Sequence, residues 1–284
     1  MVKNADIWSL YRVTEYPLDL SNPVYSEYPF LKLGVAGSVR HYAEKLTPVV
    51  QEIIAAHPGY TGWVLTAPPC HRLPAAANLL CWDIYKRLQH LAPARNISVV
   101  DLKRPPGDTV LENAKDFSNY NDYSKYTWQE RAALKSKHDF LVREENFRNR
   151  GIVFINDINV TGSGLAYISE TFATVYPDPL HWVYIIDCDE SVGRAWPQLE
   201  NEINSFAIPT LRDFGAVLAR EDIRHTAKCI SKLFTYSVDE LEQLLAMLGQ
   251  DQRSRLWNAV LEEGLYHGEF FKEKLDLLRA HCIA

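Results

Sequence analysis

One stretch of the chain combines an acid, several small residues and a helix start in an order that suits anion binding. It spans residues 151–172 and reads GIVFINDINVTGSGLAYISETF. The apolar run 152–155 predicts a buried parallel strand. Asp157 follows at the carboxyl end of that strand, where ligands of open α/β sheets bind. The small residues from Thr161 to Gly164 let backbone N–H groups close on an anion at the start of the next helix, so the stretch predicts a phosphate cradle.

The spacing in this stretch matches neither a P-loop nor a dinucleotide fingerprint. It resembles the phosphoribosyl-pyrophosphate (PRPP) motif of type I phosphoribosyltransferases: four apolar residues, two acids, two or three small or apolar residues, then Thr-Gly-x-Thr. The resemblance implies that Asn156 and Asp157 face the ribose hydroxyls and that the next residues wrap the 5′-phosphate. Two positions depart from the motif, since Asn156 replaces the first acid and Gly164 replaces the last Thr. The implied PRPP-binding residues are Asn156, Asp157, Asn159, Val160, Thr161, Gly162, Ser163 and Gly164. The alternative is an ordinary turn and Gly-rich helix start of an α/β protein.

A second strand and loop lie upstream, at residues 61–88. Pro68 and Pro69 fix the backbone after the strand, and His71 and Arg72 add the donors that a pyrophosphate site requires. The loop and the later Asn78 are similar in kind to the ComF-like branch of the phosphoribosyltransferases. The resemblance implies a pyrophosphate site made of Pro69, Cys70, His71, Arg72, Lys103 and Arg104. A purely structural proline turn is the alternative.

A third segment, from Tyr126 to Gly151, resembles the helix and hairpin that precede the PRPP strand in the same branch. Gln129, Arg131 and Phe140 carry that similarity, and Gln129 and Arg131 are expected in a lid. A charged, solvated helix is the alternative. The preceding residues, 105–126, have little apolar periodicity and predict a long loop, which we interpret as a lid that excludes water from the reacting centre.

Composition sets further bounds on the function. The chain has 284 residues and a net charge of −6, which argues against nucleic-acid binding as its main function. No apolar stretch approaches the roughly 18 residues of a membrane span, and the N-terminus lacks the apolar region of a signal peptide. Five cysteines without a CxxC pair fit reduced thiols. The expected compartment is the cytoplasm.

Alternation of strand and helix patterns predicts a doubly wound, mostly parallel α/β sheet. Residues 1–35 are rich in Tyr and Pro; they are expected to form an extension packed on the core or a hood over an acceptor. Residues 36–204 form the expected phosphoribosyltransferase-like core. Residues 205–284 predict only helices, one of them with a capping box of Ser237 and Glu240. The resemblance stops before these helices, which could serve packing, homodimer formation or the acceptor pocket.

The resemblance implies an enzyme that uses PRPP and Mg²⁺ and passes ribose 5-phosphate to an unidentified planar or aromatic small molecule, releasing pyrophosphate. Asp157 is the expected metal ligand and the charge that stabilises an oxocarbenium-like centre. Two other hypotheses stay open. One is a PRPP- or nucleotide-binding regulator without turnover, which Asn156 favours. The other is a flavodoxin-like module that binds a different anion.

Overall fold

The computed structural model describes residues 6–91, 96–103, 129, 140, 142–176 and 178–282. Its centre is a five-stranded sheet in the order β1-β5-β4-β2-β3, in which every pairing is parallel. The strands are β1 (Asp6–Val13), β2 (Trp63–Thr66), β3 (Ile97–Val99), β4 (Gly151–Asn159) and β5 (His181–Cys188). Strands β4 and β5 are buried on both faces, as their continuous apolar sequences predict.

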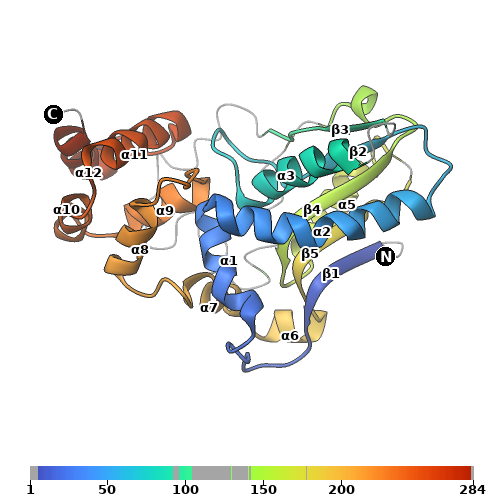
Figure 1. Ribbon diagram of the computed structural model, residues 1–284, viewed down its shortest axis with the longest axis horizontal. Coiled ribbons are helices and arrows are strands. Elements are labelled where there is room, and N and C mark those ends of the chain that lie inside the picture. Colours follow the sequence, from blue (N-terminus) through green and yellow to red (C-terminus); the bar gives the residue numbers. More distant parts are fainter. Residues whose placement is uncertain are drawn as a thin grey trace.

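Helices cover both faces of the sheet (Figure 1). Helices α2 (Ala36–Ala56) and α3 (Ala76–Leu91) pack on one face, where Val153 and Ile155 of β4 join their core. Helix α5 (Ser163–Phe172) packs on the other face, with Ile152 and Phe154. The doubly wound parallel sheet expected from the sequence is therefore confirmed.

The first 35 residues contribute an element of the sheet itself. Strand β1 pairs with β5 at one edge, and α1 (Pro23–Leu33) follows it. Tyr25 and Tyr28 of α1 are buried, so neither ring faces solvent as a stacking platform. The half-buried Tyr16 stacks on Trp196 with ring centroids 4.6 Å apart. This segment is thus integrated into the core, with α1 beside the later helices.

The described chain after β5 consists of helices and their connections, and it includes the helices predicted for residues 205–284. Its helices are α6 (Glu190–Ala195), α7 (Leu199–Ser205), α8 (Leu211–Leu218), α9 (Ala227–Thr235), α10 (Val238–Ala246), α11 (Gln250–Glu263) and α12 (Glu269–Cys282). Helices α8 to α12 bury a separate apolar core, which Leu33 and Leu73 join from the first half of the chain. The capping box of Ser237 and Glu240 is confirmed at the start of α10. Gly249 is the N-cap residue of α11.

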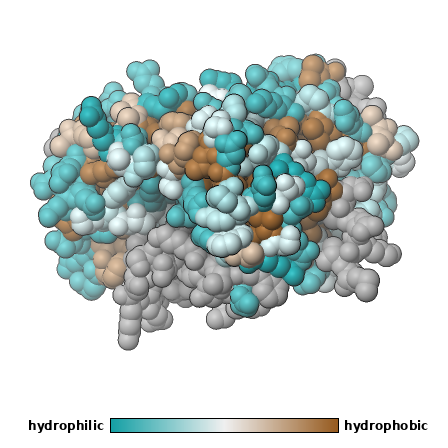
Figure 2. Space-filling view, turned by 90° about the horizontal axis from the view of Figure 1, so that it is seen from below, coloured by the Kyte–Doolittle hydropathy of each residue, from teal (hydrophilic) through white to brown (hydrophobic). Residues whose placement is uncertain are grey.

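The face in Figure 2 carries its hydrophobic residues in small groups among hydrophilic ones. Among the helices that the structure describes, none combines the length and apolar character needed to cross a membrane. A short 3₁₀ helix (Glu144–Asn146) leads into β4.

Candidate functional site

The sheet has a topological switch point between β2 and β4. The chain leaves β2 through α3 and reaches β3 on one side, whereas it leaves β4 through α5 and reaches β5 on the other. Ligands of doubly wound sheets bind in the crevice outside the strand ends at such a point. Two loops flank it: residues 160–164, here called the phosphate loop, and residues 68–72, the proline loop.

The phosphate loop is shaped by a glycine in a left-handed conformation. Gly162 has φ +71° and caps the start of α5, and a Cβ there would meet no atom within 4 Å. Its N–H donates to Oδ1 of Asn159 at 3.2 Å, and the hydroxyls of Thr161 and Ser163 are 2.8 Å apart. The first N–H groups of a helix have no intrahelical partner, and the helix dipole favours anions there. This loop therefore has the local geometry of an anion cradle.

Helix α6 packs closely against the phosphate loop. A Cβ at Gly193 of α6 would collide with the carbonyl oxygen of Val160. Only glycine permits such a close approach of helix and loop.

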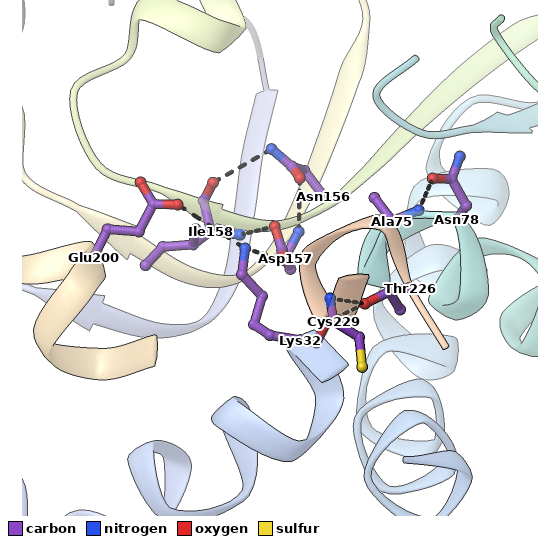
Figure 3. Close-up of polar contacts among 9 residues, drawn as sticks. All are labelled: Lys32, Ala75, Asn78, Asn156, Asp157, Ile158, Glu200, Thr226 and Cys229. Atoms are coloured by element: carbon purple, nitrogen blue, oxygen red, sulfur yellow. Dashed lines mark hydrogen bonds and ion pairs between the residues drawn. The ribbon is translucent and has the colours of Figure 1, made fainter. Parts of the chain in front are cut away.

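Asp157 is paired with a lysine that the sequence did not single out. Strand β4 extends through Asn159, so Asp157 lies within it, and its side chain is directed toward α1 (Figure 3). Nζ of Lys32 donates to Oδ2 of Asp157 at 2.7 Å and lies 3.9 Å from Oε1 of Glu200. Oδ1 of Asp157 accepts from the N–H of Ile158 at 2.9 Å. Asp157 is buried, with only 7% of its surface exposed, and the positive charge of Lys32 balances its negative charge.

A buried phenol lies beside this ion pair. Nζ of Lys32 is 5.6 Å from the ring centroid of Tyr28. Burial raises the pKa of Tyr28 well above its ordinary value, and the charges of Asp157 and Glu200 raise it further. Tyr28 is therefore a neutral side chain at physiological pH.

Two asparagine side chains of β4 form hydrogen bonds, one within the strand and one to β5. Oδ1 of Asn156 accepts from the N–H of Asp157 at 2.9 Å, and its Nδ2 donates to the carbonyl of Ile158 at 3.3 Å. Asn159 donates to Asp187 at 2.8 Å. Burial raises the pKa of Asp187, although the hydrogen bond from Asn159 and the charge of Arg12 oppose that shift. Asn156 thus folds back on its own strand.

The proline loop carries a buried thiol. Cys70 forms a parallel bridge with Lys103, and Nζ of Lys103 lies 3.3 Å from its Sγ. Burial raises the pKa of Cys70, against the opposing effect of Lys103. A reactive thiolate needs a lowered pKa, and Cys70 has the opposite shift.

The C-terminal helices hold the other side of the proline loop. The N–H of Leu73 donates to Oε2 of the buried Glu263 at 2.7 Å, and Nδ1 of His71 lies 3.3 Å from the carbonyl oxygen of Glu263. Asn78 accepts from the N–H of Ala75 at 2.9 Å and donates to the carbonyl of Pro68 at 3.3 Å. Asn78 and Glu263 therefore fix the loop's shape.

Comparison with known proteins decides the family. The family described as PRTase ComF-like matches residues 7–278. The chain belongs to this family. No curated protein and no solved structure gave a significant match. The match extends through the C-terminal helices, which the sequence resemblance had left outside.

The structure brings together several of the residues expected in a ComF-like phosphoribosyltransferase. The phosphate loop and the proline loop flank the same switch point, and Lys103 joins the proline loop through Cys70. Gln129 is described only as an exposed helical residue. Arg104, Arg131 and residues 105–126 of the expected lid lie outside the described residues. No local sequence pattern points to Lys32, Glu200 or Glu263, because each contacts a partner far away along the chain.

Proposed function

We propose that this protein is a phosphoribosyltransferase that transfers ribose 5-phosphate from PRPP to a small, planar acceptor and releases pyrophosphate. The proposal extends the family membership to a specific reaction. The observation that carries it is the left-handed Gly162 at the start of α5, placed at the switch point of the sheet. Here the 5′-phosphate would accept hydrogen bonds from backbone N–H groups. The five cysteines are all free thiols, which supports a reducing cytoplasmic setting.

Mg²⁺ would enter this site chiefly as a partner of PRPP. Among the described residues, no group of three or more His, Cys, Asp or Glu side chains could hold a metal ion. Mg²⁺ commonly uses one or two carboxylates together with substrate oxygens and water. Asp157 fits the role of the single carboxylate, and the metal would neutralise charge on the pyrophosphate group.

Asp157 is also the proposed catalytic residue. Its negative charge would stabilise the positive charge that develops on the ribose as the bond to pyrophosphate breaks. In the structure Lys32 balances that charge at 2.7 Å. We therefore propose that Lys32 moves away from Asp157, or shares it with the substrate, when PRPP binds.

The test is a titration with PRPP and Mg²⁺, followed by a pyrophosphate-release assay with a library of planar acceptors. Gly162→Val should weaken PRPP binding more than tenfold, because its side chain obstructs the approach to the phosphate and disfavours the observed φ of +71°. Asp157→Ala should abolish transfer while PRPP affinity stays within about tenfold, because the carboxylate acts mainly on the transition state. Unchanged binding by a folded Gly162→Val variant would place the phosphate elsewhere.

A PRPP-binding regulator without turnover is the second candidate. Two observations favour it: Asn156 replaces an acid, and Asp157 is already paired with Lys32. The regulator should bind PRPP and release no pyrophosphate with any acceptor. An Asn156→Asp variant separates the two, because a working enzyme should keep activity with an altered Mg²⁺ dependence, whereas a regulator could gain pyrophosphate release. Identical Mg²⁺ profiles for both proteins would show that Asn156 faces away from the ribose.

A further inference from the structure

The end of α11 contacts three consecutive residues at the end of the proline loop. The carbonyl oxygen of Glu263 lies 3.3 Å from Nδ1 of His71, and its Oε2 accepts a hydrogen bond from the N–H of Leu73 at 2.7 Å. Between these two residues, the guanidinium of Arg72 lies against Gly264: a Cβ built on this glycine would be 2.7 Å from Nη1 and 3.2 Å from Cζ. One helix end therefore holds this part of the loop at three points.

Gly264 suits this contact for two reasons. It ends α11 in the left-handed conformation, with φ +62°, and its N–H donates to the carbonyl oxygen of Val260 at 3.2 Å. Glycine adopts this conformation without strain, which is a common reason for its presence after a helix. Its missing side chain also leaves the space that the guanidinium of Arg72 occupies. The carbonyl end of a helix carries partial negative charge, so it attracts this cation.

Arg72 keeps its hydrogen-bond donors available in this position. The residue is exposed, and it forms no hydrogen bond or ion pair with a residue that the structure describes. A guanidinium has five N–H donors in a planar fork that matches phosphate oxygens. A carboxylate partner would occupy part of that fork, whereas the partial charge of a helix end orients the cation and leaves the fork open.

We propose that Gly264 is a positioning residue for Arg72, and that the end of α11 directs this guanidinium toward the pyrophosphate group of the substrate. This inference rests on the proposed phosphoribosyltransferase function and assigns part of its leaving-group contact to the C-terminal helices. A cation that is already in place loses little side-chain freedom when the anion binds. The C-terminal helices then contribute to affinity as well as to the shape of the loop.

Calorimetric titration of the full chain with inorganic pyrophosphate and Mg²⁺ tests the role of Arg72. Arg72→Gln should weaken this binding about tenfold or more, because charge-assisted hydrogen bonds to the anion are lost. Arg279→Gln removes the same charge from an exposed position on α12 and should change the affinity less than about twofold. Equal affinities of the two variants, or no binding by the wild type, overturn the proposal.

A pair of glycine variants separates the contact with Arg72 from the backbone conformation. Gly264→Ala and Gly268→Ala both place a Cβ on a residue with positive φ, +62° and +92° respectively. Only the Cβ at position 264 meets Arg72, since a Cβ at position 268 would meet nothing within 4 Å. Gly264→Ala should therefore weaken pyrophosphate binding about threefold or more, and Gly268→Ala less than about twofold. Equal affinities of these two folded variants overturn the positioning role.

A double variant tests whether Gly264 acts through Arg72. When Arg72→Gln is already present, adding Gly264→Ala should cause no further loss of pyrophosphate affinity, because the guanidinium that the methyl group displaces is absent. A further loss as large as that in the wild-type background overturns the link. Gly264→Asn replaces Gly264→Ala if the latter unfolds, since asparagine tolerates the left-handed region and carries the same Cβ. Circular dichroism verifies the folding of each variant.

These outcomes are distinguishable from failure of the proposed transferase reaction. Pyrophosphate binding with the expected losses, but without pyrophosphate release from PRPP, contradicts the transfer and supports the role of Gly264. Transfer by the wild type, together with unchanged pyrophosphate affinity in Gly264→Ala, contradicts the role of Gly264 alone.

Discussion

The phosphate loop and the proline loop lie at the ends of adjacent strands, yet they are held in different ways. Contacts between close neighbours shape the phosphate loop, such as the hydrogen bond from Gly162 to Asn159. The proline loop depends on Glu263, which lies 190 residues from Leu73 along the chain. One site can thus combine a locally determined loop with a loop that needs the complete fold. The C-terminal helices are therefore structural parts of the site.

The phosphate loop also contacts a more distant element, because α6 packs closely against Val160. Gly193→Ala should destabilise the protein by about 3 kcal/mol or more, because the added methyl group collides with the backbone of Val160. Urea unfolding measures the effect. Gly59→Ala is the control, since its Cβ would meet nothing within 4 Å. A loss below about 1 kcal/mol would show that α6 can shift and that the phosphate loop is more independent than the structure indicates.

The dependence of the proline loop on Glu263 can be tested by a pair of variants. Glu263→Ala should cost roughly 2 to 3 kcal/mol, since it leaves the N–H of Leu73 buried without its acceptor. Glu263→Gln keeps an oxygen in place and should recover much of that loss. Hydrogen exchange at Leu73 should accelerate in the Ala variant alone. Equal exchange in both variants would contradict the role of this contact.

The C-terminal region should also make the fold sensitive to acid. Burial, aided by the charge of Arg255, lowers the pKa of His225 to about 4. An unfolded histidine has a pKa near 6.5, so the folded state gains stability above that pH and loses it as the pH falls toward 4. Between pH 7.5 and pH 5 the wild type should lose about 2 kcal/mol more than His225→Asn, measured by urea unfolding. Parallel losses in both proteins would remove His225 as the cause.

The smallest expected effect concerns the phosphate loop itself. Gly162→Ala should cost about 1 kcal/mol, because the observed φ of +71° strains a residue with a Cβ. Gly162→Asn should cost less, because asparagine tolerates the left-handed region. Thermal unfolding of the two variants compares them directly. A larger cost for Asn would contradict a purely conformational role of Gly162.

The sequence predicted those parts of the structure whose causes are close together in the chain. The apolar run before Asp157, the glycine at 162 and the capping box at Ser237 are each contained in a few residues, and the structure has them. Strand β1 was not predicted from the sequence. Its apolar Ile7 and Trp8 are exposed, so its sequence does not show the alternation of buried apolar and exposed polar residues, and its partner β5 is distant along the chain. Lys32 was missed for a similar reason. It lies in the last turn of α1, where a lysine is ordinary, and only the fold places it against Asp157.

The position of β1 has a consequence for the order of events during synthesis. This strand is synthesised before the other strands of the sheet, and its partner β5 follows about 175 residues later. At ordinary elongation rates of 5 to 20 residues per second, β1 waits roughly 10 to 35 s for its partner. During that interval the segment that contains Ile7, Trp8 and Tyr11 has no partner strand to pair with. Chaperones protect exposed apolar segments of this kind. The strand of this sheet that is synthesised first is therefore among the last to be paired.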